Sequence, residues 1–317
     1  MNYLGIDIGA SNIAAAVISN DFSILGRAKL KVRHGISSAE FCDDIADAAR
    51  TAAADAGSPL EDIAYCGIGC PGIISSHSGV LEYASNLEYS DLPLAYEIGR
   101  RLGMSTYIEN DANCAALGEV CAGAAKDAQS ALVVTVGTGI GGGIIIDGKI
   151  YSGVNGIAGE IGHMVLFPGG SPCGCGRKGC WEAYASATAL KRQTRDAMEA
   201  APDSLMWKFA PSPDKVSGKT AFQAKREGDA SAAMVVETYI HYLAEGLTNC
   251  INILQPEVVC IGGGVCNEGD ELMIPLREQV QRHRFGRGNI RHPRIVAAKL
   301  SGEAGIIGAA MLGRGLH

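Results

Sequence analysis

The chain has 317 residues, of which 47% are hydrophobic and 19% charged, and its formal net charge is −7. This composition excludes a disordered chain and allows two domains with buried cores. Its Lys and Arg residues are scattered, no apolar run approaches the roughly 20 residues of a membrane span, and the first seven residues lack the basic start of a signal peptide. We therefore expect a cytoplasmic protein without nucleic-acid or membrane partners.

Strands and helices mix along the first 120 residues. Strands are expected at residues 3–8, 13–19, about 24–32, 63–68 and 106–109, and helices at 39–56, 94–102 and 111–120. The first two strands flank a turn that begins at Gly9, which is a hairpin pattern. Mixed elements of this kind indicate an α/β class.

The strand–turn–strand pattern returns in the second half of the chain. Strands are expected at 131–136 and 141–146 around Gly137-Thr138-Gly139, with a later strand at 258–261. Helices are expected at about 229–254 and 302–312, and loops at 164–180 and 201–220. Two similar glycine turns, roughly 130 residues apart, predict a duplicated fold with a cleft between its halves.

The glycine turns are candidate phosphate-binding segments. A tight turn presents several backbone N–H groups to one side, and glycine lets a ligand approach the backbone closely. Ser11, Thr138 and the turn amides can donate to phosphate oxygens, while the carboxylate of Asp7 can hold Mg²⁺. A third glycine run follows a buried strand at 262–264. Simple hairpin turns without a ligand are the alternative, and no Walker pattern is present.

Three carboxylates stand out from their surroundings. Asp111 lies where a strand ends and a helix begins, so it is either a helix N-cap or a base that takes the proton of an attacking hydroxyl. Asn110 or Asn113 can assist the cap. Glu160 and Glu182 lie among small and apolar residues, and each needs partners, which sugar hydroxyls or structural hydrogen bonds can supply.

A candidate metal site lies between residues 163 and 180. Three thiols, of Cys173, Cys175 and Cys180, follow His163 within a glycine-rich segment. Three cysteines and one histidine form a common structural Zn²⁺ site, in which four protein ligands leave no open position. The alternatives are a disulfide, which a reducing compartment disfavours, and reactive thiols.

The sequence resembles the ROK family (repressors, open reading frames and kinases), and its glucokinase-like enzymes in particular, over essentially its whole length. The most specific matches are Gly159–His163 (GEIGH) and Cys173–Glu182 (CGCGRKGCWE), which correspond to the zinc signature of the family. The phosphate segments are matched at Asp7–Gly9 and Gly137–Gly143, and the catalytic segment at Glu109–Asn113. The nucleotide side at the C-terminal end is matched at Ile261–Val265 and Gly305–Ala310.

The resemblance implies an actin-like, hexokinase-type (ribonuclease H-like) duplicated fold. A small N-terminal α/β domain would comprise residues 1–112 and about 300–317, and a large one residues 113–299 with the zinc loop. Asp111 would be the catalytic base for transfer from Mg·ATP to a hexose hydroxyl, with Zn²⁺ in a structural role. The sugar would be bound by Asn86, Asn110, Glu160, His163 and Glu182, and the nucleotide and its phosphates by Asp7, Gly9, Ser11, Asn12, Gly137, Thr138, Gly139, Gly263 and Gly264.

Two departures from the family pattern affect substrate choice. Asn12 stands where many relatives have a basic residue, and no tryptophan follows Asn86-Leu87. Glucose is the first substrate expected, with N-acetylmannosamine, fructose, allose and mannose as alternatives. A non-catalytic sugar sensor is a further alternative. A repressor is not expected, because only six residues precede Asp7. Relatives suggest a homodimer or homotetramer.

Overall fold

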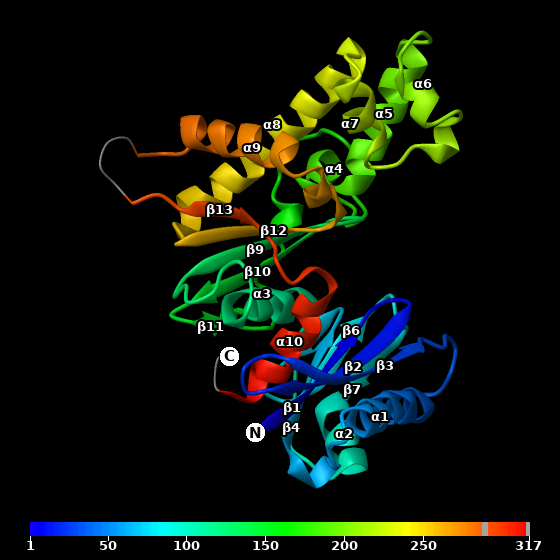
Figure 1. The fold of residues 1–317 in the computed structure, drawn as a ribbon, viewed down its shortest axis with the longest axis vertical. Helices are drawn as coiled ribbons and strands as arrows, with labels where there is room; N and C mark the ends of the chain where they lie inside the picture. Colours follow the sequence, from blue (N-terminus) through cyan, green and yellow to red (C-terminus); the bar gives the residue numbers. More distant parts are fainter. Residues whose placement is uncertain (287–290, 315–317) are drawn as a thin grey trace. The chain divides into compact units, whose positions relative to one another are not determined.

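The computed structural model describes residues 1–286 and 291–314 (Figure 1). The chain forms two compact units, and the division between them passes through two strands. Unit 1 comprises Met1–Val133, Gly143–Gly159 and the chain from Ala298 on. Unit 2 comprises Val134–Gly142 and Glu160–Ala297.

Unit 1 is built on a five-stranded sheet in the order β3-β2-β1-β4-β8. Strands β1, β2 and β3 are antiparallel neighbours, whereas β1, β4 and β8 run parallel. Their bounds are β1 Asn2–Ile8, β2 Asn12–Ser19, β3 Ile24–Lys31, β4 Ile63–Cys70 and β8 Thr106–Asn110. Because β1 and β4 are covered on both faces, they read as nearly continuous apolar runs.

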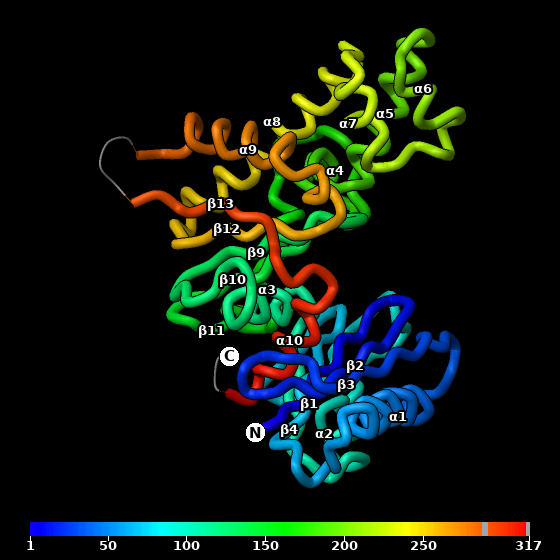
Figure 2. The backbone as a smooth tube through the Cα atoms, viewed as in Figure 1, coloured from blue at the N-terminus to red at the C-terminus, as the bar shows by residue number. Residues whose placement is uncertain are grey.

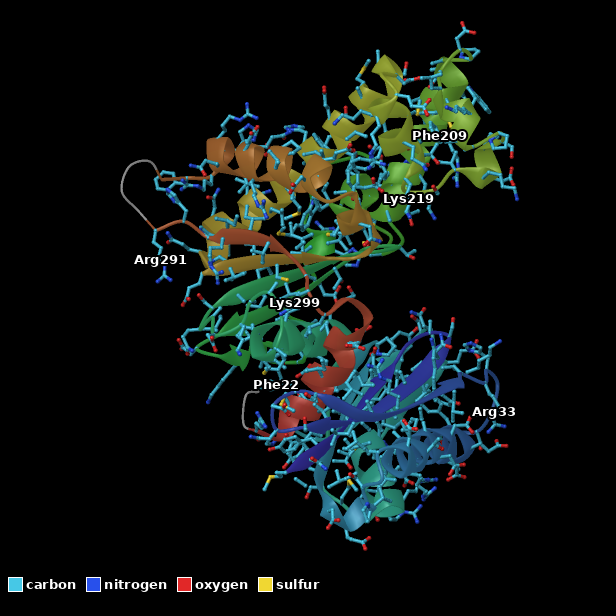
Figure 3. The ribbon with its side chains drawn as sticks, in the orientation of Figure 1. Phe22, Arg33, Phe209, Lys219, Arg291 and Lys299 are labelled. Carbon is cyan, nitrogen blue, oxygen red and sulfur yellow. The ribbon has the colours of Figure 1, made fainter. Side chains whose placement is uncertain are left out.

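Helices lie on both faces of this sheet. On one side are α1 (Ser38–Asp55) and α2 (Leu94–Leu102), and on the other are α3 (Asp111–Cys121) and α10 (Ala304–Met311) (Figure 1). Ser37 caps α1 by accepting from the Glu40 amide, while the Glu40 carboxylate accepts from the Ser37 amide. Arg33, labelled in Figure 3, pairs with Asp44 of α1 at 2.8 Å.

Helix α10 contacts β1, β4 and α3 with almost no side chains in between. A Cβ on Gly308 would lie 1.7 Å from the Cys114 carbonyl oxygen, and one on Gly67 would lie 1.8 Å from the Ala309 carbonyl oxygen. Figure 2 shows the C-terminal segment running beside the N-terminal strand. Strand β1 and helix α10, far apart in the sequence, are therefore joined in one unit.

A buried carboxylate fixes the entry to α10. Glu119 of α3 is 1% exposed and accepts hydrogen bonds from the backbone amides of Lys299 and Leu300 at 3.1 and 2.8 Å. Lys299 is labelled in Figure 3. A short 3-10 turn, η5 (Ser301–Glu303), then leads into α10, and η6 (Leu312–Arg314) follows it.

A small antiparallel sheet follows β4 in the chain. Its strands are β5 (Ile73–Ser75), β6 (Val80–Ala84) and β7 (Tyr89–Leu92), in the order β5-β6-β7. These three strands were not predicted, because two of them have four residues or fewer and none has a long alternating pattern. The turn between β6 and β7 carries Asn86.

The second large sheet repeats the order of the first. Its order, β11-β10-β9-β12-β13, matches β3-β2-β1-β4-β8 strand for strand. The bounds are β9 Ala131–Val136, β10 Ile140–Ile146, β11 Lys149–Ile150, β12 Val258–Gly262 and β13 Arg294–Ala297. The predicted duplicated α/β fold of the actin-like, hexokinase type is thereby confirmed.

Unit 2 also contains a group of helices around the long helix α8 (Ala230–Leu254). Asp229 caps α8 by accepting from the Ala232 amide at 2.7 Å. The other elements are α4 Glu182–Ala185, α5 Ala187–Ala200, α6 Met206–Phe209, α7 Thr220–Arg226 and α9 Asp270–His283, with the 3-10 turns η2 Ile161–His163, η3 Pro213–Lys215 and η4 Gly264–Glu268. In unit 1, η1 is Leu60–Asp62.

Two expectations differ from the structure. Residues 201–220 are not only loop, since α6 and η3 form there and α7 begins at Thr220. The boundary between the compact units does not fall at residue 112. Residues 113–133 and 143–159 group with unit 1, because α3 packs on α10.

Among the residues described, no helix has the length and apolarity that a bilayer crossing requires.

We expect Gly308→Ala to destabilise the protein by about 2–4 kcal/mol, because the new methyl group meets backbone that cannot move without separating α10 from α3. Gly302→Ala is the matched control, since a Cβ there meets no atom within 4 Å. Urea unfolding of the two variants measures the difference. Equal free energies of unfolding would contradict this account of the packing.

Candidate functional site

In unit 1, the candidate residues gather where three parallel strands end. The register aligns Asp7 of β1 with Gly69 of β4, and Cys70 of β4 with Asn110 of β8. Asp111 follows directly as the first residue of α3. Ligands of open α/β sheets bind beyond the carboxyl ends of the strands, so this edge of the sheet is the natural place for chemistry.

Asp7 and Asp111 are partly buried carboxyl groups, and their surroundings disfavour the ionised form of each. Burial, followed by the charge of Asp111, raises the pKa of Asp7 from 3.8 to about 6. Burial also raises the pKa of Asp111, against the opposing effect of hydrogen bonds from the Ala112 amide and the Asn110 side chain. Two carboxyl groups with raised pKa values at one edge of the sheet make this edge a candidate functional site.

The surroundings of this carboxylate pair are apolar and tightly packed. Cys70 and Cys114 are fully buried, and burial raises the pKa of each thiol, so both remain neutral. A Cβ on Gly305 would lie 3.0 Å from the Asp7 carboxyl carbon, and one on Gly69 would lie 3.2 Å from Cys114. The lack of a side chain at Gly305 thus leaves room for the Asp7 carboxyl group.

The N-cap of α3 is Asn110, not Asp111. The Asn110 side-chain oxygen accepts from the amides of Ala112 and Asn113 at 2.9 and 3.3 Å, and its Nδ2 donates to the Gly72 carbonyl at 3.3 Å. The N-cap alternative for Asp111 is therefore wrong. Asp111 accepts from Ala112 at 2.9 Å as a first-turn residue.

Sequence reasoning missed the role of Glu109. This carboxylate is 1% exposed and accepts from the hydroxyls of Ser76 and Ser152 at 3.0 and 2.9 Å, from the Asn113 side chain at 3.0 Å and from the Asn110 amide at 2.7 Å. It ties two loops to the end of β8. A carboxylate at the last inward position of a strand was the available signal.

The first glycine turn, between β1 and β2, closes on itself. The Gly9 amide donates to the Asn12 carbonyl at 2.8 Å, which leaves the exposed Ala10 and Ser11 at the tip. Asn12 is the first residue of β2 and is half-buried. Asn86 lies exposed in the turn between β6 and β7.

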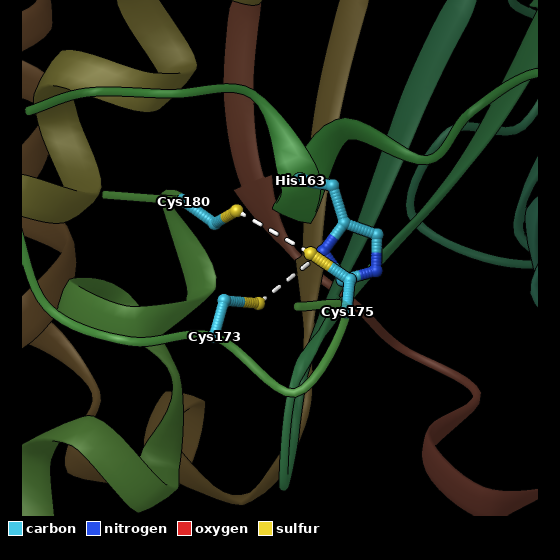
Figure 4. A group of neighbouring side chains, drawn as sticks. All are labelled: His163, Cys173, Cys175 and Cys180. Atoms are coloured by element: carbon cyan, nitrogen blue, oxygen red, sulfur yellow. Dashed lines mark hydrogen bonds between the residues drawn. The ribbon is translucent and has the colours of Figure 1, made fainter. Parts of the chain in front are cut away.

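In unit 2, the four predicted metal ligands come together (Figure 4). The ligand atoms of His163, Cys173, Cys175 and Cys180 all lie within 4.8 Å of one another. The Sγ atoms of Cys175 and Cys180 are 3.7 Å apart, and Cys173 Sγ is 3.6 Å from His163 Nδ1. Tetrahedral bonds of about 2.3 Å to sulfur and about 2.0–2.1 Å to nitrogen place neighbouring ligand atoms roughly 3.5–3.8 Å apart, so this donor set fits zinc.

Backbone contacts shape the loop of residues 164–180, here called the thiol loop. Cys180 forms an isolated bridge with Val165, and the Cys173 amide donates to the Arg177 carbonyl at 2.9 Å. Gly179 has a φ of 86°, and a Cβ there would lie 1.8 Å from the Phe167 carbonyl oxygen. Glycine is required at this position both for its conformation and for the close approach.

Glu182 links this loop to the second glycine turn. One carboxylate oxygen lies 3.1 Å from Cys173 Sγ and 3.7 Å from His163 Nδ1. The other accepts from the Ile140 amide at 3.2 Å, and a Cβ on Gly139 would lie 2.3 Å from it. The glycine is therefore needed so that the turn and the carboxylate can meet.

The remaining candidates in unit 2 are solvent-accessible. His163 Nε2, on the far side of the ring from the thiols, lies 3.8 Å from the carboxylate of Glu160, which is 66% exposed. Gly137 and Thr138 are exposed at the tip of the second turn, where the Gly137 amide donates to the Gly139 carbonyl at 3.0 Å. Gly263 has a φ of 106° and, like Gly264, is exposed after β12.

Known proteins resemble this chain over its whole length. The sequence model of the ROK family matches residues 3–315. A glucokinase from Thermotoga maritima is 36% identical over 98% of this chain and 97% of its own, and one from Halalkalibacterium halodurans is 34% identical over 98% and 94%. The crystal structure of a ROK family glucokinase from Streptomyces griseus in complex with glucose and AMPPNP is 34% identical, with a TM-score of 0.81 over 99% of this chain and 100% of that one.

The raised pKa of Asp7 predicts a stability effect with a defined sign. The folded protein binds this proton more tightly than the unfolded chain does, so folding loses stability as pH rises from about 4 to about 6. We expect Asp7→Asn to increase the free energy of unfolding at pH 7.5 by about 1–3 kcal/mol and to change it little at pH 4. Urea unfolding of both proteins at several pH values tests this, and a variant less stable than the wild type at pH 7.5 would refute it.

Proposed function

This chain belongs to the ROK family, and from that premise we propose that it transfers the γ-phosphoryl group of ATP to a hydroxyl of a free hexose, with glucose as the first substrate. The observation that carries the proposal is Asp111. This carboxyl group stands at the end of β8, its pKa is raised by burial, and it lies beside a second carboxylate at the same edge of the sheet.

In the proposed reaction, Asp111 acts as the general base. Its carboxylate accepts the proton of the sugar hydroxyl, O6 in glucose, while that oxygen attacks the γ-phosphorus in line and ADP leaves. The raised pKa makes Asp111 a stronger base than an ordinary aspartate. Because Asn110 supplies the helix cap, the Asp111 side chain is not needed for that purpose.

Mg²⁺ is the proposed counterion of the phosphates, and Asp7 is the residue that would hold it. A hard cation prefers carboxylate oxygen, and Asp7 presents one beside the charge of Asp111. When bound, the ion would neutralise charge on the β- and γ-phosphates. The bound cation would lower the pKa of Asp7, which burial and then the charge of Asp111 raise, so cation binding and ionisation of this carboxyl group favour each other.

The glycine turns are the proposed phosphate and nucleotide segments. The Gly9 and Gly137 amides close their own turns, so phosphate oxygens would be bound by the neighbouring tip residues Ser11 and Thr138 and their amides. Gly139, Gly263 and Gly264 would keep the backbone open to the nucleotide. Asn12 offers a neutral amide on this side.

Sugar recognition is proposed for polar side chains of both units. In unit 2, His163 turns Nδ1 toward the thiols and Nε2 away from them, which suits one nitrogen for zinc and the other for a hydroxyl. Glu160 and Glu182 would accept sugar hydroxyls, and Asn86 and Asn110 are the sugar-binding residues proposed in unit 1. The competing substrates are mannose, allose, fructose and N-acetylmannosamine.

The proposed assembly is a homodimer or a homotetramer.

We expect Asp111→Asn to lower kcat by about 10²–10⁴-fold with little change in KM, because the amide keeps the shape but takes no proton. A coupled ATP assay with glucose and the four competing hexoses measures this. Asp214→Asn, at an exposed aspartate of η3, is the matched control and should keep full activity. The acid limb of the wild-type kcat/KM profile should lie above the usual aspartate pKa of about 4. Near-normal turnover by the Asp111 variant would remove that residue from the base role.

We propose that the Cys₃His cluster holds one structural Zn²⁺. Protein purified without chelator should then contain about one zinc per chain. We expect Cys175→Ser to lose the metal and to lower the unfolding temperature, since the loop would lose its cross-link. Cys121→Ser, at a cysteine of α3 outside the cluster, should keep both. Wild-type protein free of zinc by metal analysis would overturn this assignment.

A further inference from the structure

A second group of metal-ligating side chains lies on the surface of unit 2, apart from the thiol loop. His241 and Glu245 stand four residues apart on α8, and His283 ends α9. The ligand atoms of the three lie within 4.8 Å of one another. His283 Nδ1 is 2.6 Å from Glu245 Oε1, and His241 Nδ1 is 3.9 Å from the same oxygen.

We propose that His241, Glu245 and His283 form a binding site for a divalent transition-metal ion, with Zn²⁺ as the ion of choice. Residues at positions i and i+4 of a helix share one face, so α8 presents an imidazole and a carboxylate together, and α9 supplies a second imidazole. Two histidines and one carboxylate are a ligand set that zinc accepts, with water in the remaining position. Imidazole ligands disfavour Mg²⁺ and Ca²⁺ here.

The three ligands are open to solvent, and a bound ion would replace the hydrogen bond between His283 and Glu245. Their side chains are 47%, 35% and 39% exposed, so an ion reaches them from solvent without any rearrangement of the core. The two arginines beside His283 are directed elsewhere. Arg282 donates to the Glu278 carbonyl at 3.3 Å, and Arg284 bonds to the Gly286 carbonyl at 3.2 Å and to His292 at 2.7 Å.

The ion would fasten α8 to α9 at a position that also supports the thiol loop. Tyr242 and Gly246 lie on the adjoining face of α8. Trp181 Nε1 donates to the Tyr242 carbonyl at 2.9 Å, and a Cβ on Gly246 would lie 2.0 Å from the Trp181 ring. Trp181 follows Cys180 directly in the chain, so a metal cross-link between α8 and α9 would stiffen the helix on which the thiol loop rests.

The test is a calorimetric titration of Zn²⁺ into full-length protein whose Cys₃His cluster is already loaded. We expect about one further ion per chain to bind, and the unfolding temperature to rise with free Zn²⁺. His241→Ala, His283→Ala and Glu245→Gln should each weaken this binding at least about tenfold and abolish the rise. His34→Ala, at an exposed histidine of unit 1, should behave as the wild type.

A second measurement separates this site from the thiol cluster. In Cys175→Ser protein, the titration should still show the ion that depends on His241 and His283, because none of its three ligands belongs to the Cys₃His set. Circular dichroism without added metal should show that the histidine variants are folded like the wild type. Absence of a further bound ion in the wild type, or undiminished binding by all three variants, would overturn the proposal.

Discussion

The close backbone packing of α10 against β1, β4 and α3 is the constraint on which unit 1 depends. At Gly5, Gly67, Gly118 and Gly308, an added Cβ would lie between 1.7 and 2.1 Å from a carbonyl oxygen of the facing element. Helix and sheet can approach so closely only where both surfaces lack side chains. The approach joins the end of the chain to its beginning and holds the start of α3, with Asp111, at the same edge of the sheet as Asp7.

That placement has an electrostatic cost. Burial raises the pKa of both carboxyl groups, and the charge of Asp111 raises that of Asp7 further, so ionising them in the folded protein costs free energy. A general base needs a high affinity for the proton. The desolvation that destabilises the folded protein also raises the pKa of Asp111 and so gives its carboxylate this affinity. The surrounding neutral thiols and glycines add no compensating positive charge. Burial of the two carboxyl groups at this edge of the sheet therefore lowers the stability of the fold while it makes Asp111 more basic.

In unit 2, the thiol loop has little regular structure and is held in place by side-chain contacts. The C-terminal end of the thiol loop is held by Trp181, which packs against α8, and by the contact of Glu182 with Ile140 and Gly139. Cysteine and histidine ligands at tetrahedral spacing fit a metal at its centre. A second cross-link between α8 and α9 would extend the same strategy to the helix beneath the loop.

The sequence by itself determined the α/β class, the duplication, helices α1, α2, α3, α8 and α10, and the grouping of His163 with three cysteines, because these depend on local periodicity, glycine turns and ligand spacing. It did not determine helices α5 and α9, the short strands β5, β6 and β7, or the role of Glu109, whose four donors come from residues 76, 110, 113 and 152. Nor did it distinguish Asn110 from Asp111 as the cap. Only the tertiary structure decided these points, since burial, pKa and hydrogen-bond partners depend on contacts between residues far apart in the chain.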